Sequence, residues 1–247
     1  MEREHITPQG VSVFHDKNEN IHSFCLCLYV RAGSLFETKE NNGISHFFEH
    51  IVFKNIHYQM GENLYQTLDR CGLDFNASTY EEFIQFIITG APAHFEEAAE
   101  ILTGIFEPIT LPEEVIDTER KRIKAEIREE DEESSLGYFT KKIAWKNTSL
   151  ERTITGKKKT LDKIKGKQLR KFQKEVLSSN NIFFYISGNY PETAVVTVTK
   201  LMENYPLTVM KKERKNLAPV PKHFFARKPK VYVKKLFLHL LLVEQLN

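Results

Sequence analysis

The chain has 247 residues, 41% of them hydrophobic and 28% charged, which is enough to bury one substantial core and leaves room for a second small one. Lys and Arg number 35 against 33 Asp and Glu, a formal net charge of +2. This near balance argues against nucleic acid or an anionic membrane as the main partner. The composition also excludes a disordered, collagen-like or disulfide-rich chain.

Signals for export are absent from the sequence pattern. The first ten residues, MEREHITPQG, are polar and carry acids, so they match neither a secretory signal peptide nor an acid-poor transit peptide. The apolar run Leu236–Val243 is interrupted by His239 and is too short to span a bilayer. The three cysteines are too few for a disulfide framework and are typical of small hydrophobic residues in a reducing compartment. We therefore expect a soluble, cytoplasmic protein.

The predicted elements alternate between strands and helices along the chain. In chain order they are two strand-like runs (Val11–His15, Ile21–Arg31), two helices (Ile44–Phe53, Glu62–Cys71), two strands (Phe75–Ser78, Phe83–Thr89), four helices (His94–Phe106, Pro112–Glu133, Gly137–Trp145, Lys167–Leu177), a strand (Ile182–Ser187) and a helix (Glu192–Asn204). The mixture predicts an α+β fold, with helices packed on a mostly antiparallel sheet.

The composition changes near residue 210. Residues 211–230 (KKERKNLAPVPKHFFARKPK) are basic, contain prolines and lack periodicity, which predicts a linker. Residues 231–247 begin a strand-like apolar run with nothing after it to pack against. We therefore expect an α+β domain over residues 1–210, a basic linker over 211–230, and the start of a second, missing domain at 231–247.

The segment GISHFFEHIVF contains His46, Glu49 and His50. On a helix these three side chains fall within about 100° of one another, and the two imidazoles lie about 6 Å apart along the axis. The opposite side carries an apolar stripe, of Ile44, Phe47, Phe48 and Ile51. The helix is therefore expected to dock on the core through that stripe, with the His/Glu/His face turned away from it.

The spacing H-x-x-E-H is the inverse of H-E-x-x-H and is a zinc-peptidase signature. Catalytic zinc takes three protein ligands and keeps a fourth position for water. The histidines would be ligands, and Glu49 is placed to take a proton from the activated water. The alternative is a pair of surface histidines beside a solvated glutamate. The remaining histidines, His94 among them, have no partner at ligand spacing.

A third ligand is needed, and the helix at 112–133 offers several carboxylates. Its apolar stripe is bordered by Glu119 and Glu126, two turns apart, and Glu130 lies on the same shoulder. Carboxylates next to an apolar face are costly unless they are paired or bind a metal. Helical geometry alone does not choose among the three.

Four segments occur in order along the chain: RAGSLFE (31–37), SHFFEHIVFKN (45–55), FNAST (75–79) and ERKRIKAEI (119–127). Together they closely resemble the insulinase/pitrilysin metallopeptidases, the inverzincins, which include the mitochondrial processing peptidases. The resemblance covers most of residues 10–210. It implies Zn²⁺ held by His46, His50 and Glu126, with Glu49 as the catalytic base. It also implies that Glu119 acts on the site by orienting a ligand, against the alternative of a salt-bridged surface acid.

By the same resemblance, Asn76 and Ala77 belong to an edge strand that holds an extended substrate by backbone pairing. The alternative is an ordinary turn capped by the asparagine side chain.

Proteins of this family fold as two similar halves that close like a clamshell around a peptide, and this chain matches the half that carries the metal. The resemblance therefore implies a zinc endopeptidase that needs a second half, from a partner chain or from a second copy of itself. The competing hypothesis is a catalytically weak or silent scaffold subunit of the same fold. A structural zinc site is a poor fit, because no cysteine lies near the motif in sequence.

Overall fold

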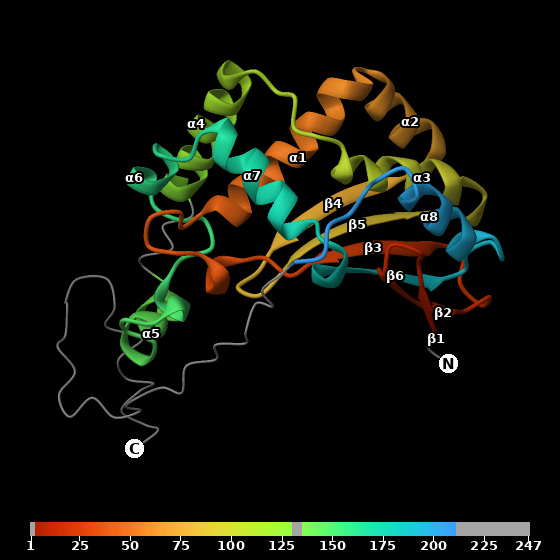
Figure 1. Ribbon diagram of the computed structural model, residues 1–247, viewed down its shortest axis with the longest axis horizontal. Helices are drawn as coiled ribbons and strands as arrows, with labels where there is room; N and C mark the ends of the chain where they lie inside the picture. Colours follow the sequence, from red (N-terminus) through yellow and green to blue (C-terminus); the bar gives the residue numbers. More distant parts are fainter. Residues whose placement is uncertain (1–2, 130–134, 211–247) are drawn as a thin grey trace.

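The computed structural model describes residues 3–129 and 135–210, shown in Figure 1. The strands are β1 (Arg3–Ile6), β2 (Ser12–Lys17), β3 (Phe24–Val30), β4 (Asp74–Thr79), β5 (Ile84–Gly90) and β6 (Ile182–Gly188). The α-helices are α1 (Ile44–Met60), α2 (Asn63–Cys71), α3 (Phe95–Thr103), α4 (Glu113–Glu129), α5 (Leu136–Ala144), α6 (Lys158–Leu161), α7 (Gly166–Val176) and α8 (Ala194–Met202). The predicted linker at 211–230 and second domain at 231–247 lie outside the described residues, so the domain division stays a prediction.

The strands form one sheet in the order β1-β2-β6-β3-β5-β4. The pairing is antiparallel except between β2 and β6, which run parallel. Most of the helices, including α1, α3, α7 and α8, lie on one side of this sheet (Figure 1). The predicted α+β class, with helices on a mostly antiparallel sheet, is confirmed.

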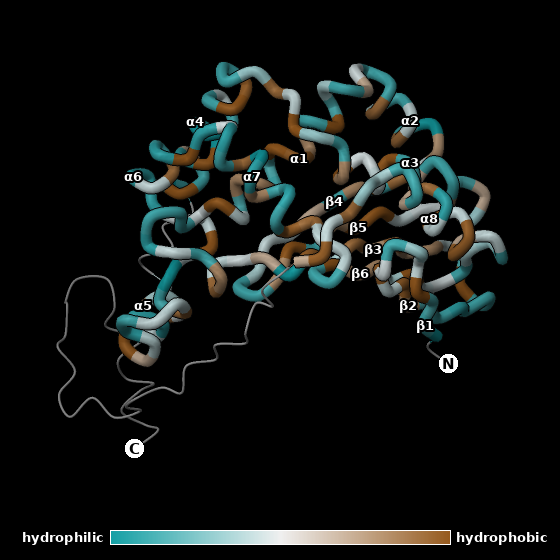
Figure 2. Tube along the Cα trace, in the orientation of Figure 1, coloured by the Kyte–Doolittle hydropathy of each residue, from teal (hydrophilic) through white to brown (hydrophobic). Residues whose placement is uncertain are grey.

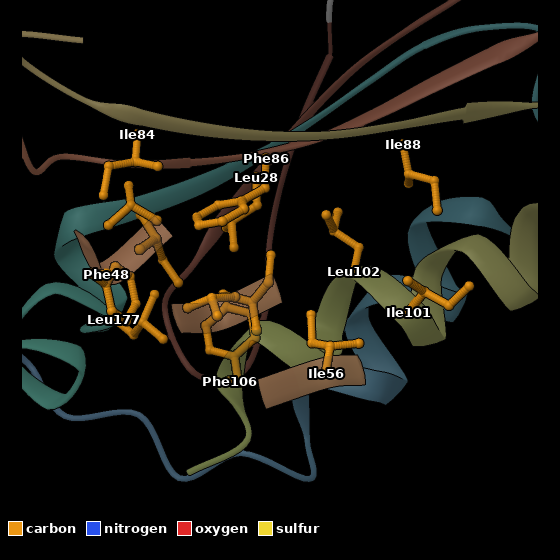
Figure 3. Close-up of a cluster of buried hydrophobic side chains, with 14 of the residues drawn as sticks. Leu28, Phe48, Ile56, Ile84, Phe86, Ile88, Ile101, Leu102, Phe106 and Leu177 are labelled. Carbon is orange, nitrogen blue, oxygen red and sulfur yellow. The ribbon is translucent and has the colours of Figure 1, made fainter. Parts of the chain in front are cut away.

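The core lies between the sheet and this helical layer. Alternate residues of the central strands point into it, among them Leu28, Ile84, Phe86 and Ile88, all fully buried. Figure 3 shows them facing side chains from the helical layer, including Ile56 and Leu102. Burial of such side chains is the main stabilising term of the fold. Figure 2 shows that hydrophobic residues recur along the central strands, whereas the outer loops are mainly hydrophilic.

Several boundaries differ from the sequence prediction. Helix α1 continues to Met60 rather than ending at Phe53, because the next turn is also held by the core. There Ile56 is buried, and Asn55 accepts a hydrogen bond from the Thr110 amide while donating one to the Pro108 carbonyl. Strand β1 and helix α6 were not predicted, since both are four residues long and neither shows a clear hydrophobic period. Among the described residues, no helix is both long and apolar enough to cross a bilayer.

The start of α1 is fixed by a buried carboxylate. Glu37, which is 5% exposed, accepts hydrogen bonds from the side-chain amide of Asn42 and from the backbone N–H groups of Gly43 and Ser45. The Gly43 and Ser45 amides lie at the N-terminus of the helix, where N–H groups have no partner within the helix itself. A negative charge there also interacts favourably with the helix dipole.

We expect the substitution Glu37→Ala to lower the free energy of unfolding by about 2 to 4 kcal/mol, because it leaves buried N–H donors without an acceptor. Urea unfolding followed by circular dichroism measures the change. The matched control is Glu40→Ala, three residues along the chain and exposed, for which a change within about 0.5 kcal/mol is expected. Equal stability of the two variants would contradict this role for Glu37.

Candidate metal centre

Two helices, α1 and α4, bring the candidate ligands together. The apolar stripe of α1 is buried as predicted, with Phe47, Phe48 and Ile51 each 0% exposed. The opposite face of α1 turns toward α4 rather than toward open solvent, and His46 on it is only 8% exposed. Helix α4 is held in place by Arg120, which lies over the ring of Phe47 and donates hydrogen bonds to the Leu161 and Ile164 carbonyls.

The distances define a compact cluster. The rings of His46 and His50 are 4.7 Å apart between centroids. One oxygen of Glu126 lies 3.7 Å from His46 Nε2, and its other oxygen lies 3.6 Å from His50 Nε2. One ligand atom from each of the three residues lies within 4.8 Å of the others. The three are therefore placed to share one ion.

This donor set fits zinc. Ligands of a tetrahedral zinc ion at about 2.0–2.2 Å lie about 3.3–3.6 Å from one another, so the observed N···O separations need to shorten by only tenths of an ångström. Two imidazoles and one carboxylate match the donor set of a three-ligand catalytic zinc site, and one of the imidazoles, His50, also lines a pocket together with Glu49.

The electrostatics of the cluster favour the ligand form of His46. Burial, together with the nearby His50, lowers the pKa of His46 to about 4. Its imidazole is therefore neutral at pH 7, with a lone pair available for a metal.

Glu49 lies beside the ligands, and a neighbouring strand holds its carboxylate. Thr79 Oγ1, at the end of β4, donates a hydrogen bond of 2.6 Å to Glu49 Oε2. Burial raises the pKa of Glu49, as does the carboxylate of Glu126, while the hydrogen bond from Thr79 and the charge of His50 act in the opposite direction. A carboxyl whose pKa is raised toward neutrality is suited to accept and return a proton.

Glu119 contacts the far side of one candidate ligand. Its two oxygens lie 3.6 Å from His50 Nδ1 and 3.5 Å from Lys54 Nζ, and the residue is 3% exposed. Burial tends to raise the pKa of Glu119, but the contact with His50 and the charges of Lys54 and Arg122 bring it below its usual value. A charged carboxylate on the second nitrogen of a histidine fixes the ring orientation and tautomer of that ligand.

Asn76 and Ala77 lie in β4, which pairs with β5 on one side and occupies the edge of the sheet. No other strand among the described residues lies on the free side of β4. Asn76 is exposed and Ala77 is half-buried against the core. The edge strand β4 ends beside Glu49, at Thr79.

A hollow opens next to the cluster, between α1, α2, α4 and β4. Its apolar lining includes Phe53, Leu68 and Phe75, and its polar lining includes His57 and Arg122. Glu49 and His50 form part of the same wall, so a molecule in this hollow would contact the candidate base and one of the three candidate ligands.

The sequence reasoning missed two contacts of this site. Thr79 is 30 residues from Glu49, and Lys54 is 65 residues from Glu119. Thr79 does lie in the quoted FNAST segment, and Lys54 in SHFFEHIVFKN. No local pattern could have identified either contact, because both depend on packing between elements distant in the chain.

Comparison with curated proteins finds zinc proteases and processing peptidases. The chain is 26% identical over 198 residues to a Bacillus subtilis protein named uncharacterized zinc protease YmxG, covering 79% of this chain and 48% of the relative. It is 31% identical over 156 residues to the mitochondrial-processing peptidase subunit beta of Rattus norvegicus, covering 62% of this chain and 32% of the relative. The chain thus spans about half or less of the length of these relatives.

Solved structures share the fold. A Helicobacter pylori protease superposes with a TM-score of 0.75 at 20% identity, over 90% of this chain and 53% of that one. A peptidase M16 inactive domain from Pseudomonas fluorescens superposes with a TM-score of 0.76 at 14% identity, over 87% and 53% of the two chains. In both cases the chain corresponds to about half of the longer structure.

The family assignment follows from the sequence match itself. The sequence model described as Insulinase (Peptidase family M16) matches residues 12–158, a span that includes the H-x-x-E-H segment, β4 and the whole of α4. Since this span is more than half of the chain, the protein belongs to the insulinase family of peptidases, M16.

Proposed function

We propose that the protein is a zinc-dependent endopeptidase that hydrolyses peptides or unfolded segments. The observation that carries this proposal is the cluster of His46, His50 and Glu126, with ligand atoms within 4.8 Å of one another, directly beside Glu49. Two further observations support it, namely the zinc protease among the relatives and the M16 family match.

His46, His50 and Glu126 would hold the zinc ion. When bound, zinc polarises the scissile carbonyl and lowers the pKa of a water molecule. Glu49 accepts the proton of the attacking water and passes it to the leaving amine nitrogen, while Thr79 keeps its carboxylate oriented. Glu119 holds the ring of His50 through Nδ1.

The substrate would bind in extended form along the free edge of β4, where a peptide strand can pair with the backbone of Asn76 and Ala77. Strand β4 ends at Thr79, and Thr79 is bonded to Glu49. A peptide on this edge is thereby brought next to the base. The hollow beside His50, with its aromatic and basic lining, would receive a side chain of the substrate.

The site would need a second half for full activity. The candidate site lies in a chain that spans about half the length of the first relative. Positioning of a peptide and exclusion of water both require a closed site. We propose that this half comes from a partner chain or from a second copy of this chain. A cytoplasmic location stays a prediction of the sequence.

A second candidate function is a catalytically weak or silent subunit of the same fold. The superposition with a domain whose title calls it inactive favours this alternative. The residues of this chain argue against it, because His46, Glu49, His50 and Glu126 are all present and the three candidate ligands among them meet in space.

The direct test is hydrolysis of a quenched-fluorescent peptide library by the zinc-loaded chain, over a wide range of chain concentrations. We expect cleavage that stops on chelation and returns with zinc. A specific activity that rises with concentration would indicate self-association of two copies. A chain that binds zinc but cleaves no peptide at any concentration would exclude a second copy of the chain as the missing half. Failure of the chain to bind zinc through His46, His50 and Glu126 would contradict the proposal itself.

A further inference from the structure

A second group of metal-ligating side chains lies away from the centre described above. Cys71 is the last residue of α2, His94 immediately precedes α3, and Glu97 lies in the first turn of α3. One ligand atom from each lies within 4.8 Å of the others. This group shares no residue and no helix with the cluster of His46, His50 and Glu126.

The contacts within the group are nearly those of a coordination shell. His94 Nδ1 lies 3.5 Å from Glu97 Oε1, and Cys71 Sγ lies 4.0 Å from the same oxygen. Ligands around a tetrahedral zinc ion, with Zn–S of about 2.3 Å and shorter bonds to nitrogen and oxygen, lie about 3.3–3.7 Å apart. Small rotations of the exposed His94 and Glu97 side chains would therefore complete the site.

The backbone on both sides is held firmly. Helix α2 ends at Gly72, which has the left-handed conformation (φ 58°) and donates to the Leu68 and Asp69 carbonyls. The next residue, Leu73, lies against Gly90, where an added Cβ would be 2.4 Å from Leu73 Cδ2. Gly90 ends β5, four residues before His94. The two segments that carry the ligands therefore already lie side by side through this contact.

The accessibility of the group suits an ion with an open coordination position. Cys71 is 5% exposed, whereas the side chains of His94 and Glu97 are each 36% exposed. The sulfur thus lies at the buried end of the site, and the nitrogen and oxygen donors lie at its solvent-facing rim. Water from the solvent side can supply the fourth ligand.

The donor types select the ion. Thiolate and imidazole are ligands for zinc and related transition metals, whereas Mg²⁺ and Ca²⁺ take oxygen ligands. We propose that Cys71, His94 and Glu97 bind a second zinc ion, which ties the end of α2 to the start of α3. The Cys71 thiol would lose its proton on binding. Because α2 also lines the hollow beside His50 through Leu64 and Leu68, this ion would stiffen one wall of the proposed substrate site.

The test uses the full chain, stripped of metal and titrated with Zn²⁺ and with Co²⁺ as a spectroscopic probe. We expect two equivalents of zinc per chain in the unchanged protein and one in Cys71→Ser. Bound Co²⁺ is expected to show a thiolate charge-transfer band in the near ultraviolet, which the sulfur-free cluster of His46, His50 and Glu126 does not produce. The band should vanish in Cys71→Ser and persist when Cys25 and Cys27, the other two cysteines, are replaced by serine.

Because the Cys71 side chain is buried, a loss of zinc binding in Cys71→Ser needs to be distinguished from a loss of folding, and a second variant does this. Glu97→Gln changes a half-buried group at the rim, and we expect it to weaken binding of the second equivalent at least about tenfold, since even a change to an outer partner of a metal ligand has an effect of about this size. Its matched control is Glu96→Gln, the exposed neighbour, with unchanged binding. A band that persists in Cys71→Ser, or equal zinc binding by both glutamine variants, would overturn the proposal. None of these readouts depends on peptide cleavage, so they stand apart from the test of the proposed function.

Discussion

Replacing Glu49 by glutamine is expected to lower peptide hydrolysis by about 10² to 10⁴-fold while zinc stays bound. The amide keeps the shape of the side chain and can still interact with Thr79, but it cannot accept the proton of the attacking water. Loss of a positioned general base costs about this much in rate. The measurement is the hydrolysis rate of the zinc-loaded variant on a fluorogenic peptide, together with its zinc content.

The matched control for this change is Glu100→Gln, an exposed carboxylate on α3, for which hydrolysis is expected to be unchanged. Glu49 is not among the three clustered ligands, so an equal zinc content in both variants separates loss of the base from loss of the metal. If Glu49→Gln retained the full rate, the assignment of Glu49 as the base would fail. If it lost zinc instead, Glu49 would have to be regarded as a ligand.

The second large effect is expected on zinc affinity, with different sizes for the two glutamates of α4. Glu126→Gln removes the anionic donor that faces both histidines, at 3.7 Å and 3.6 Å, and is expected to weaken zinc binding by more than about 100-fold. Glu119→Gln removes only the carboxylate behind His50 Nδ1. A change to a residue that contacts a metal ligand, but not the metal, lowers metal affinity by about 10 to 100-fold.

Competition with a chromophoric chelator measures both affinities. Glu129→Gln is the control, since Glu129 lies on the same helix, three residues after Glu126, and is exposed. Its zinc affinity is expected to equal that of the unchanged chain. A larger loss in Glu119→Gln than in Glu126→Gln would reverse the two roles and make Glu119 the ligand.

The candidate centre shows how far sequence reasoning reached. The spacing of His46, Glu49 and His50 was enough to place three polar groups on one face of a helix and an apolar stripe on the other, because both are properties of a single helix. The third ligand was different. Glu119, Glu126 and Glu130 share one shoulder of a helix, so only the resemblance to a family singled out Glu126, and that role stays a proposal.

The structure separates two of these three carboxylates through the packing of α4 on α1. It places Glu126 opposite the Nε2 atoms of both histidines and Glu119 against the Nδ1 atom of one of them. Glu130 lies outside the described residues. The expectation that the histidine face turns away from the core was only half right, because α4 covers that face and leaves His46 8% exposed.

Other features had no local signal at all. The sequence shows no partner for His94 at ligand spacing, yet His94 lies near Cys71, 23 residues away, and Glu97. The bond between Thr79 and Glu49 likewise joins a strand to a helix. Strand β1 and helix α6, too short to show a period, were also found only in three dimensions.

The sequence by itself determined the fold class, the family and the two-faced character of the helix that carries the motif, because periodicity and ordered motifs are properties of the linear chain. Only the tertiary structure decided which carboxylate faces which nitrogen of His50, that Thr79 holds Glu49, and that Cys71 meets His94 and Glu97. These contacts join side chains on separate elements. Their distances depend on how the elements pack, and no spacing along the chain records that packing.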